Sequence, residues 1–162
     1  MIIKVCEYIP GVLGRVTELH ARYYHQYWGF DLFFETKVAA EMAEFLRRSD
    51  PARDGLWVAM MDDRIVGSVA VHGQEADTRG ARLRWLIVAQ EYQGRGFGKK
   101  LMREAIEFCR RARFGRIYLT TFAGLHAARS LYEKEGFRLV AETEDTHWGK
   151  TVLEQTFELA LR

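Results

Sequence analysis

The feature that most constrains this sequence is a glycine-rich stretch that lies between an apolar run and an amphipathic segment. Residues 83–88 are apolar with β-branched members, which predicts a buried strand. From Lys99 onward, apolar residues recur at helical spacing. The residues between these segments contain three alternating glycines, in the order Gly94, Arg95, Gly96, Phe97 and Gly98. The stretch therefore predicts a strand that passes through a glycine-rich loop into a helix.

A helix that begins at such a loop favours an anion at its first turn. The first backbone N–H groups of a helix have no partner within the helix, and the helix dipole is positive at that end. Both properties favour a phosphate group, and glycine lets a ligand approach the backbone closely. The residues from Gln93 to Lys99 therefore predict a cradle for a pyrophosphate.

What the loop lacks narrows the choice of phosphate ligand. A P-loop needs Gly-Lys followed by Ser or Thr, with another glycine five positions before the second one. Here Lys99 is followed by Lys100, and the position five before Gly98 is Gln93. The dinucleotide fingerprint also fails, because its third glycine, counted from Gly94, would fall on Lys99. ATP with magnesium and a dinucleotide are therefore disfavoured.

Two motifs resemble those of the GNAT superfamily of N-acetyltransferases. The first is Gln93–Gly98, which is similar to the family pattern Gln/Arg-x-x-Gly-x-Gly/Ala. The second is Ala127–Phe137, which is similar to Ala-x-x-Leu-Tyr-x-x-x-Gly-Phe and has Tyr132 as its tyrosine. Two positions depart from the family pattern, because Gln90 stands where proline is common and Leu125 where asparagine is common.

At a finer level the chain resembles the acetyltransferase half of fused regulators in which a MarR-type winged helix precedes the enzyme. The stretches that carry this resemblance are residues 27–31, 50–54, 64–68 and 121–125. No winged helix precedes the domain in this sequence, so DNA binding is not part of the expectation.

The resemblance implies that acetyl-CoA is the cosubstrate and that no metal takes part. In the family, the glycine loop holds the pyrophosphate. The preceding strand splays from the next one there and leaves backbone groups free for the pantetheine arm and for the oxyanion, a preorganised arrangement. The cofactor-binding positions implied here are Ile87, Val88, Gln93, Gly94, Arg95, Gly96, Phe97, Gly98, Lys99, Ser130 and Tyr132.

The resemblance also implies catalytic residues. The family uses the tyrosine of the second motif as a general acid, so Tyr132 is expected to protonate the departing CoA sulfur. A phenol with a pKa near ~10 can donate to a thiolate whose conjugate acid is near ~8.5 when it is well oriented. For the base that deprotonates the amine, His72 and Glu75 have the best positions, near where acceptor amines enter in the family. Transfer through water stays open, as do the other candidates, Asp77, His20, His25 and His147.

The order of expected elements predicts one α/β domain over residues 1–162, with a GNAT-like mixed, mostly antiparallel sheet of six or seven strands flanked by about four helices. The expected strands are residues 2–8, 55–61, 64–72, 83–88, 116–122, 138–144 and 151–159. The expected helices are residues 12–28 and 33–48, one from Lys99 onward, and a short one over residues 126–135.

Composition limits the other function classes. The net charge of +2 is too small to argue for nucleic acid or a membrane surface by itself. No signal peptide or spanning segment is visible, and Cys6 and Cys109 match no metal or redox spacing. We therefore expect a cytoplasmic protein with a small-molecule amine as partner, without nucleic acid or membrane, and a homodimer is left open.

The sequence thus predicts an enzyme that moves an acetyl group from acetyl-CoA to an amine, with a small molecule as the first choice. A protein N-terminus or a lysine is the alternative acceptor, and a non-catalytic acyl-CoA-binding sensor is the alternative of another class. A dense aromatic group spans the end of the first expected helix and the start of the second, and its spacing favours core or dimer contacts over an acceptor site. Its members are Tyr23, Tyr24, Tyr27, Trp28, Phe30, Phe33 and Phe34.

Overall fold

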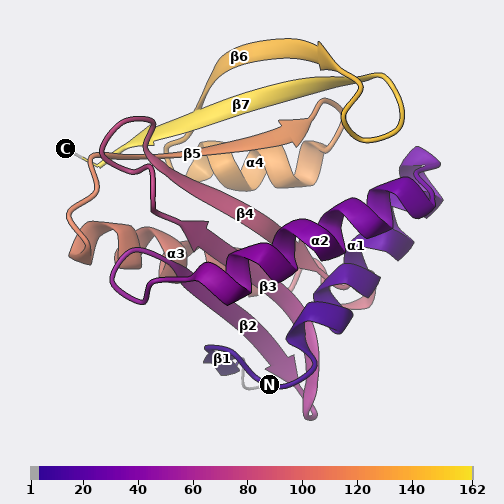
Figure 1. The fold of residues 1–162 in the computed structure, drawn as a ribbon, viewed down its shortest axis with the longest axis horizontal. Coiled ribbons are helices and arrows are strands. Elements are labelled where there is room, and N and C mark those ends of the chain that lie inside the picture. The colour runs from indigo at the N-terminus through magenta and orange to yellow at the C-terminus, as the bar shows by residue number, and fades with distance from the viewer. Residues whose placement is uncertain (1–3, 162) are drawn as a thin grey trace.

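The computed structural model describes residues 4–161 and contains one mixed sheet with helices on both faces (Figure 1). The elements in chain order are β1 (Lys4–Cys6), α1 (Val12–Trp28), α2 (Leu32–Arg48), β2 (Gly55–Met61), β3 (Arg64–His72), β4 (Ala81–Val88), the 3-10 turn η1 (Gln90–Tyr92), α3 (Phe97–Arg111), β5 (Arg116–Phe122), α4 (His126–Lys134), β6 (Arg138–Asp145) and β7 (Val152–Ala160).

The sheet has seven strands in the order β1-β2-β3-β4-β5-β7-β6. Five of the neighbouring pairs are antiparallel, and the pair β4–β5 is parallel. The predicted mixed, mostly antiparallel α/β sheet is therefore confirmed. The first strand is shorter than expected, and residues 2 and 3 of the predicted strand lie outside the described part of the chain.

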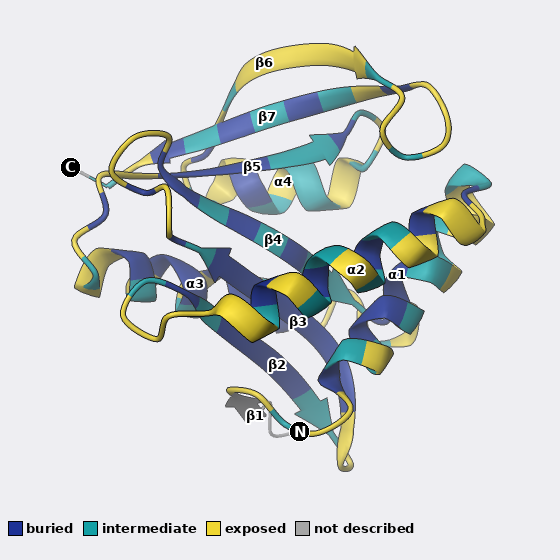
Figure 2. Cartoon of the chain, viewed as in Figure 1, coloured by how far each residue is buried: buried dark blue, intermediate teal, exposed yellow. Residues whose placement is uncertain are grey.

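Two apolar clusters hold the helices against the sheet (Figure 2). On one face α1 and α2 bury residues such as Val16, Phe34 and Met42 against β2–β4. On the other face α3 buries a stripe that begins at Phe97 and includes Leu101. Each such side chain stabilises the fold by roughly 1.5–3 kcal/mol. Because this stripe begins at Phe97, the helix starts two residues earlier than predicted, and Gly98 lies inside its first turn.

The feature that matters most for a site is the divergence of β4 and β5. The two strands pair only at Ala81–Ile117 and Arg82–Tyr118, and they separate beyond that point (Figure 1). A register shift between β3 and β4 accompanies the divergence, and Trp85 has a positive φ of 50° there. The hydroxyl of Ser68 donates a 2.7 Å hydrogen bond to the Trp85 carbonyl and holds this irregularity. The predicted splay of the two strands is confirmed.

Candidate functional site

The glycine loop has the backbone conformation that its sequence predicts. Gly94 and Gly96 have φ values of 77° and 88°, in the left-handed region that favours glycine. A Cβ atom at either residue would meet no atom within 4 Å, so conformation rather than space requires glycine. Gly96 is the N-cap of α3, and this position provides no side-chain cap for the first turn of the helix. Because the loop from Gln93 to Gly96 is exposed, the unpaired N–H groups of this turn are accessible to an anion.

A cleft opens next to this loop, between β4 and α4. We call it the cofactor cleft; it has a volume of about 260 Å³. Its lining residues are Tyr23, Tyr24, Leu86, Ile87, Val88, Tyr92, Gln93, Gly94, Phe97, Gly98, Gly124, Leu125, His126, Ala127, Ala128, Leu131 and Tyr132. Leu131 of α4 lies so close that a Cβ on Gly98 would approach its Cδ2 atom to 3.3 Å. The second predicted motif therefore packs directly against the first.

Most of the predicted cofactor-binding residues gather at this cleft. The seven that line it are Ile87, Val88, Gln93, Gly94, Phe97, Gly98 and Tyr132. Gly96 and Lys99 line a neighbouring surface groove along α3, together with further basic side chains. The Arg95 guanidinium lies 5.3 Å from the ring centre of Tyr92, and Ser130 is exposed on α4. The binding roles of these residues stay predictions.

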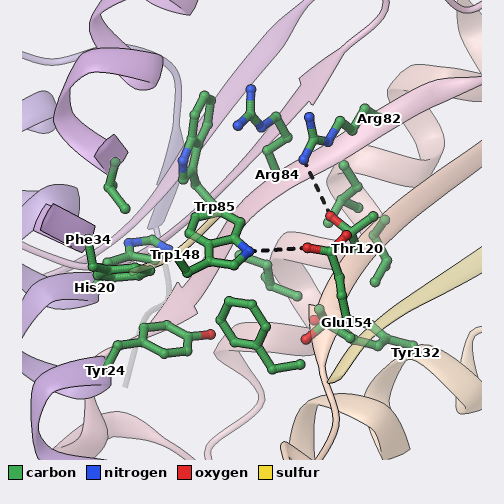
Figure 3. Close-up of a pocket in the computed structure, with 16 residues that line it drawn as sticks. His20, Tyr24, Phe34, Arg82, Arg84, Trp85, Thr120, Tyr132, Trp148 and Glu154 are labelled. Atoms are coloured by element: carbon green, nitrogen blue, oxygen red, sulfur yellow. Dashed lines mark hydrogen bonds between the residues drawn. The ribbon is translucent and has the colours of Figure 1, made fainter. Parts of the chain in front are cut away.

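A second cavity of about 100 Å³ lies deeper in the splay, and we call it the arginine pocket (Figure 3). Its lining residues are His20, Tyr24, Phe34, Val38, Arg82, Leu83, Arg84, Trp85, Leu86, Leu119, Thr120, Thr121, Phe122, Tyr132, Trp148 and Glu154. Part of the predicted aromatic group, including Tyr24 and Phe34, packs in the core and also forms a wall of this pocket. Phe33 of the same group is 57% exposed, so the group includes surface residues as well as core and pocket residues.

The two cavities share Tyr24, Leu86 and Tyr132. Tyr132 is only 6% exposed. Burial raises the pKa of its phenol to about 12, while a hydrogen bond with Thr121 acts in the opposite direction. Burial and the neighbouring Tyr132 raise the pKa of Tyr24 as well. Both phenols therefore carry their protons at neutral pH, at the junction of the two cavities.

Two charged side chains of β4 give the arginine pocket its polarity. Arg84 is 11% exposed, and its Nη2 atom lies 2.9 Å from Oε1 of Glu41 on α2. Arg82 donates from Nη2 to the Thr120 hydroxyl at 3.3 Å. Burial and the neighbouring Arg82 lower the pKa of Arg84. Burial acts to raise the pKa of Glu41, but its ion pairs with Arg84 and Lys37 outweigh this effect and lower it.

The predicted base candidates occupy different places. His72 lies on β3 with its ring edge against Phe45, and neither His72 nor Glu75 is among the residues that line the two cavities. Burial lowers the pKa of His72. Their catalytic role stays a prediction. His20, one of the candidates left open, does line the arginine pocket, where its Nδ1 atom lies 2.8 Å from the Val16 carbonyl oxygen.

Sequence reasoning missed the arginines and Glu154. A signal for the arginines was present, because Arg82 and Arg84 alternate within an otherwise apolar strand and so face the same side of the sheet. Glu154 had no comparable signal, because only the order of strands in the sheet brings β7 next to β5 and so places Glu154 at the pocket.

Within residues 4–161, no group of three or more His, Cys, Asp or Glu side chains could hold a metal ion. No helix in this part is long and apolar enough to cross a bilayer.

Comparisons with known proteins agree with this geometry. Residues 13–137 match the acetyltransferase (GNAT) family. N-acetylaspartate synthetase from Danio rerio is 34% identical over 126 residues, which cover 77% of this chain and 44% of that protein. The chain spans less than half the length of the first curated relatives that it matches.

Solved structures share the fold at low identity. An acetyltransferase of the GNAT family from Staphylococcus aureus has a TM-score of 0.76 at 20% identity, with 99% of this chain and 100% of that chain covered. The yncA protein of Salmonella typhimurium, solved with its cofactor acetyl-CoA, has a TM-score of 0.76 at 14% identity, with 99% and 94% covered.

Proposed function

Because this chain belongs to the acetyltransferase (GNAT) family, we propose that it is an acetyl-CoA-dependent N-acetyltransferase that acts on the amino group of a small molecule. The observation that carries this proposal is the junction of two cavities at Tyr24, Leu86 and Tyr132. One cavity continues to the glycine loop, and the other is lined by aromatic and charged side chains. A donor and an acceptor bound in the two cavities would meet at this junction.

The cofactor cleft fits acetyl-CoA, which supplies the acetyl group as a thioester. Exposed backbone N–H groups at the start of α3 would bind the diphosphate, with Arg95 and Lys99 nearby on the surface. The space between β4 and α4 would take the pantetheine arm. The irregular end of β4, held by the bond from Ser68 to Trp85, presents backbone groups that the neighbouring β5 does not pair.

Tyr132 is proposed as the general acid. A bond forms between the amine nitrogen and the acetyl carbon while the carbon–sulfur bond breaks, so the amine loses a proton and the sulfur gains one. The buried Tyr132 phenol keeps its proton at neutral pH and lies where the two cavities join. His72 and Glu75 remain the proposed bases, with water as the alternative route.

A small molecule is favoured over a lysine or a protein N-terminus by the nature of the arginine pocket. The pocket is small, about 100 Å³, and contains two arginines on one strand. A lysine side chain would bring only a cation toward these like charges, whereas a small amine can also carry an anionic group that they attract. The relative from Danio rerio is named N-acetylaspartate synthetase, which points to an amino acid as the acceptor of that protein. The finer resemblance to MarR-fused acetyltransferases remains a prediction.

Two assays separate the enzyme from a non-catalytic acyl-CoA sensor. Acetyl-CoA should raise the Tm with increasing concentration, since a ligand at 100 times its Kd stabilises the folded state by about 2.7 kcal/mol. Release of free CoA thiol should then require an added amine. A shift in Tm without thiol release by any amine would favour the sensor, and the absence of any shift would remove both alternatives.

A further inference from the structure

The proposed function leaves the acceptor open, and the charges of the arginine pocket narrow it. Resting on that function, we propose that the acceptor is an amine that also carries a carboxylate group, as amino acids do. Arg82, supported by Arg84, binds this carboxylate. Glu154, on the β7 side of the pocket, faces the amino end.

The first observation is the concentration of positive charge on one strand. Arg82 and Arg84 lie two residues apart on β4, so both side chains lie on the same face of the sheet and line the same pocket (Figure 3). Burying two like charges together is unfavourable unless negative groups compensate them. Glu41 compensates Arg84 at 2.9 Å, but it is shared with Lys37 at 3.2 Å. A single carboxylate, Glu41, therefore compensates two cations near Arg84.

The second observation is the state of Arg82 itself. Its guanidinium has five N–H donors, and one of them bonds to the Thr120 hydroxyl. The Nε atom is buried and has no hydrogen-bond partner within residues 4–161, and the ion pairs of this part of the chain do not include Arg82. Buried polar groups in proteins are nearly always paired. An anion with two oxygens, such as a carboxylate, would satisfy a guanidinium through two parallel bonds.

The third observation is the position of Glu154. It lies on β7 opposite Phe122 of β5, two residues along that strand from Thr120, to which Arg82 donates. Because side chains two residues apart on a strand share a face, Glu154 lies on the same face of the sheet as Thr120, across β5 from Arg82. Glu154 accepts a 3.1 Å hydrogen bond from the Trp148 indole, which fixes the carboxylate at the pocket. Positive charge on β4 and negative charge on β7 thus match the two ends of an amino acid.

Other acceptors fit these charges less well. A diamine would place its second cation against the arginines and offer them no anion. A neutral aromatic amine would fill the wall formed by Tyr24 and Phe34 but would leave the Arg82 Nε–H without a partner. An amino acid satisfies both walls.

The first test compares amines that differ in the carboxylate. The panel consists of L-aspartate, L-alanine, L-alaninamide and phenethylamine, and the readout is CoA thiol release with acetyl-CoA. We expect kcat/KM for the two amino acids to exceed that of L-alaninamide at least tenfold. Equal or faster turnover of L-alaninamide or phenethylamine would overturn this inference and leave the proposed function intact. No turnover of any amine would overturn both.

The second test uses Arg82→Gln, which keeps hydrogen-bonding groups and removes the charge. We expect KM for the preferred amino acid to rise about 10- to 100-fold, with little change for L-alaninamide, so that the preference disappears. The rise in Tm with acetyl-CoA should stay as in the unchanged protein. Arg138→Gln, at an exposed position of β6, is the matched control and should keep the preference.

A purely structural role of Arg82 gives a different result. It would lower the Tm and slow both substrates equally, and this outcome would overturn the proposal. If Arg82→Gln does not fold, Arg82→Lys replaces it. Because lysine keeps the charge but loses the two-pronged geometry, KM for the amino acid should rise less than with glutamine while the preference over L-alaninamide persists. An unchanged KM in Arg82→Lys, together with lost folding in Arg82→Gln, would also count against the proposal.

Discussion

The cofactor cleft and the arginine pocket are adjacent, but they are built in opposite ways. The phosphate end of the cleft consists of main-chain groups from one continuous stretch, around Gly94 and Gly96. The pocket consists of side chains from α1, α2, β4, β5, α4, β7 and the turn before β7. A site made from backbone depends on local conformation, whereas a site made from side chains depends on the whole fold. The two regions should therefore respond differently to substitution, pH and salt.

The largest expected effect is at the residue that belongs to both regions. Tyr132→Phe removes the proposed proton donor, and general acid catalysis contributes typically about 10²- to 10⁴-fold. We expect kcat to fall within this range, while the shift in Tm caused by acetyl-CoA changes little. Tyr92→Phe is the matched control, because Tyr92 lines only the cofactor cleft. An unchanged kcat in Tyr132→Phe would remove the assigned role.

His20, which lines the arginine pocket, should make the free energy of unfolding depend on pH. Burial lowers the pKa of His20 from 6.5 to about 4, so the folded protein disfavours the charged imidazole. The unfolded chain then binds more protons between these values, and stability is fully present above pH 6.5 and is lost as the pH falls toward 4. The loss amounts to about 3 kcal/mol.

Chemical denaturation at pH 7 and pH 4.5 measures this loss. His20→Gln should show a weaker dependence on pH than the unchanged protein. Identical pH dependence in His20→Gln and the unchanged protein would mean that another group is responsible.

A smaller effect is expected from the backbone of the loop. Gly96→Ala places a side chain where φ is 88°, a conformation that costs non-glycine residues roughly 1–2 kcal/mol. We expect the Kd for acetyl-CoA, measured by calorimetry, to rise about tenfold, with the preference among acceptors unchanged. Gly115→Ala, at a glycine with open space around it, is the control. Equal affinity in both variants would contradict a cradle made of main-chain groups.

The smallest effect is expected from the exposed cations near the loop. Lys99→Gln should weaken acetyl-CoA binding only a few-fold, because water and salt screen exposed charges. The difference should shrink further at about 1 M salt. Lys134→Gln, on the exposed side of α4, is the control and should not change the Kd. A loss of acetyl-CoA affinity as large as that in Gly96→Ala would mean that charged side chains contribute as much to binding as the backbone groups do.

The same contrast explains how much could be predicted from the sequence. The loop and the fold were accessible because Gly94, Gly96 and the apolar stripe from Leu101 are local signals of one chain segment. The sequence places the start of α3 two residues too late, because glycine at Gly98 favours a loop. Phe97 already belongs to the buried stripe of the helix. Glu154 and Arg82 line the same pocket only because β7 lies next to β5, which no local pattern encodes.

The short parallel contact of β4 with β5 has a mechanical consequence. Strands β1–β4 and strands β5–β7 are each continuous ladders, and two residue pairs, Ala81–Ile117 and Arg82–Tyr118, form the seam between them within residues 4–161. A ligand bound between the diverging strands therefore takes the place of the missing contacts between β4 and β5. Stiffness across the sheet becomes a property of the loaded protein, and slower amide exchange along β4 and β5 after loading would report it directly.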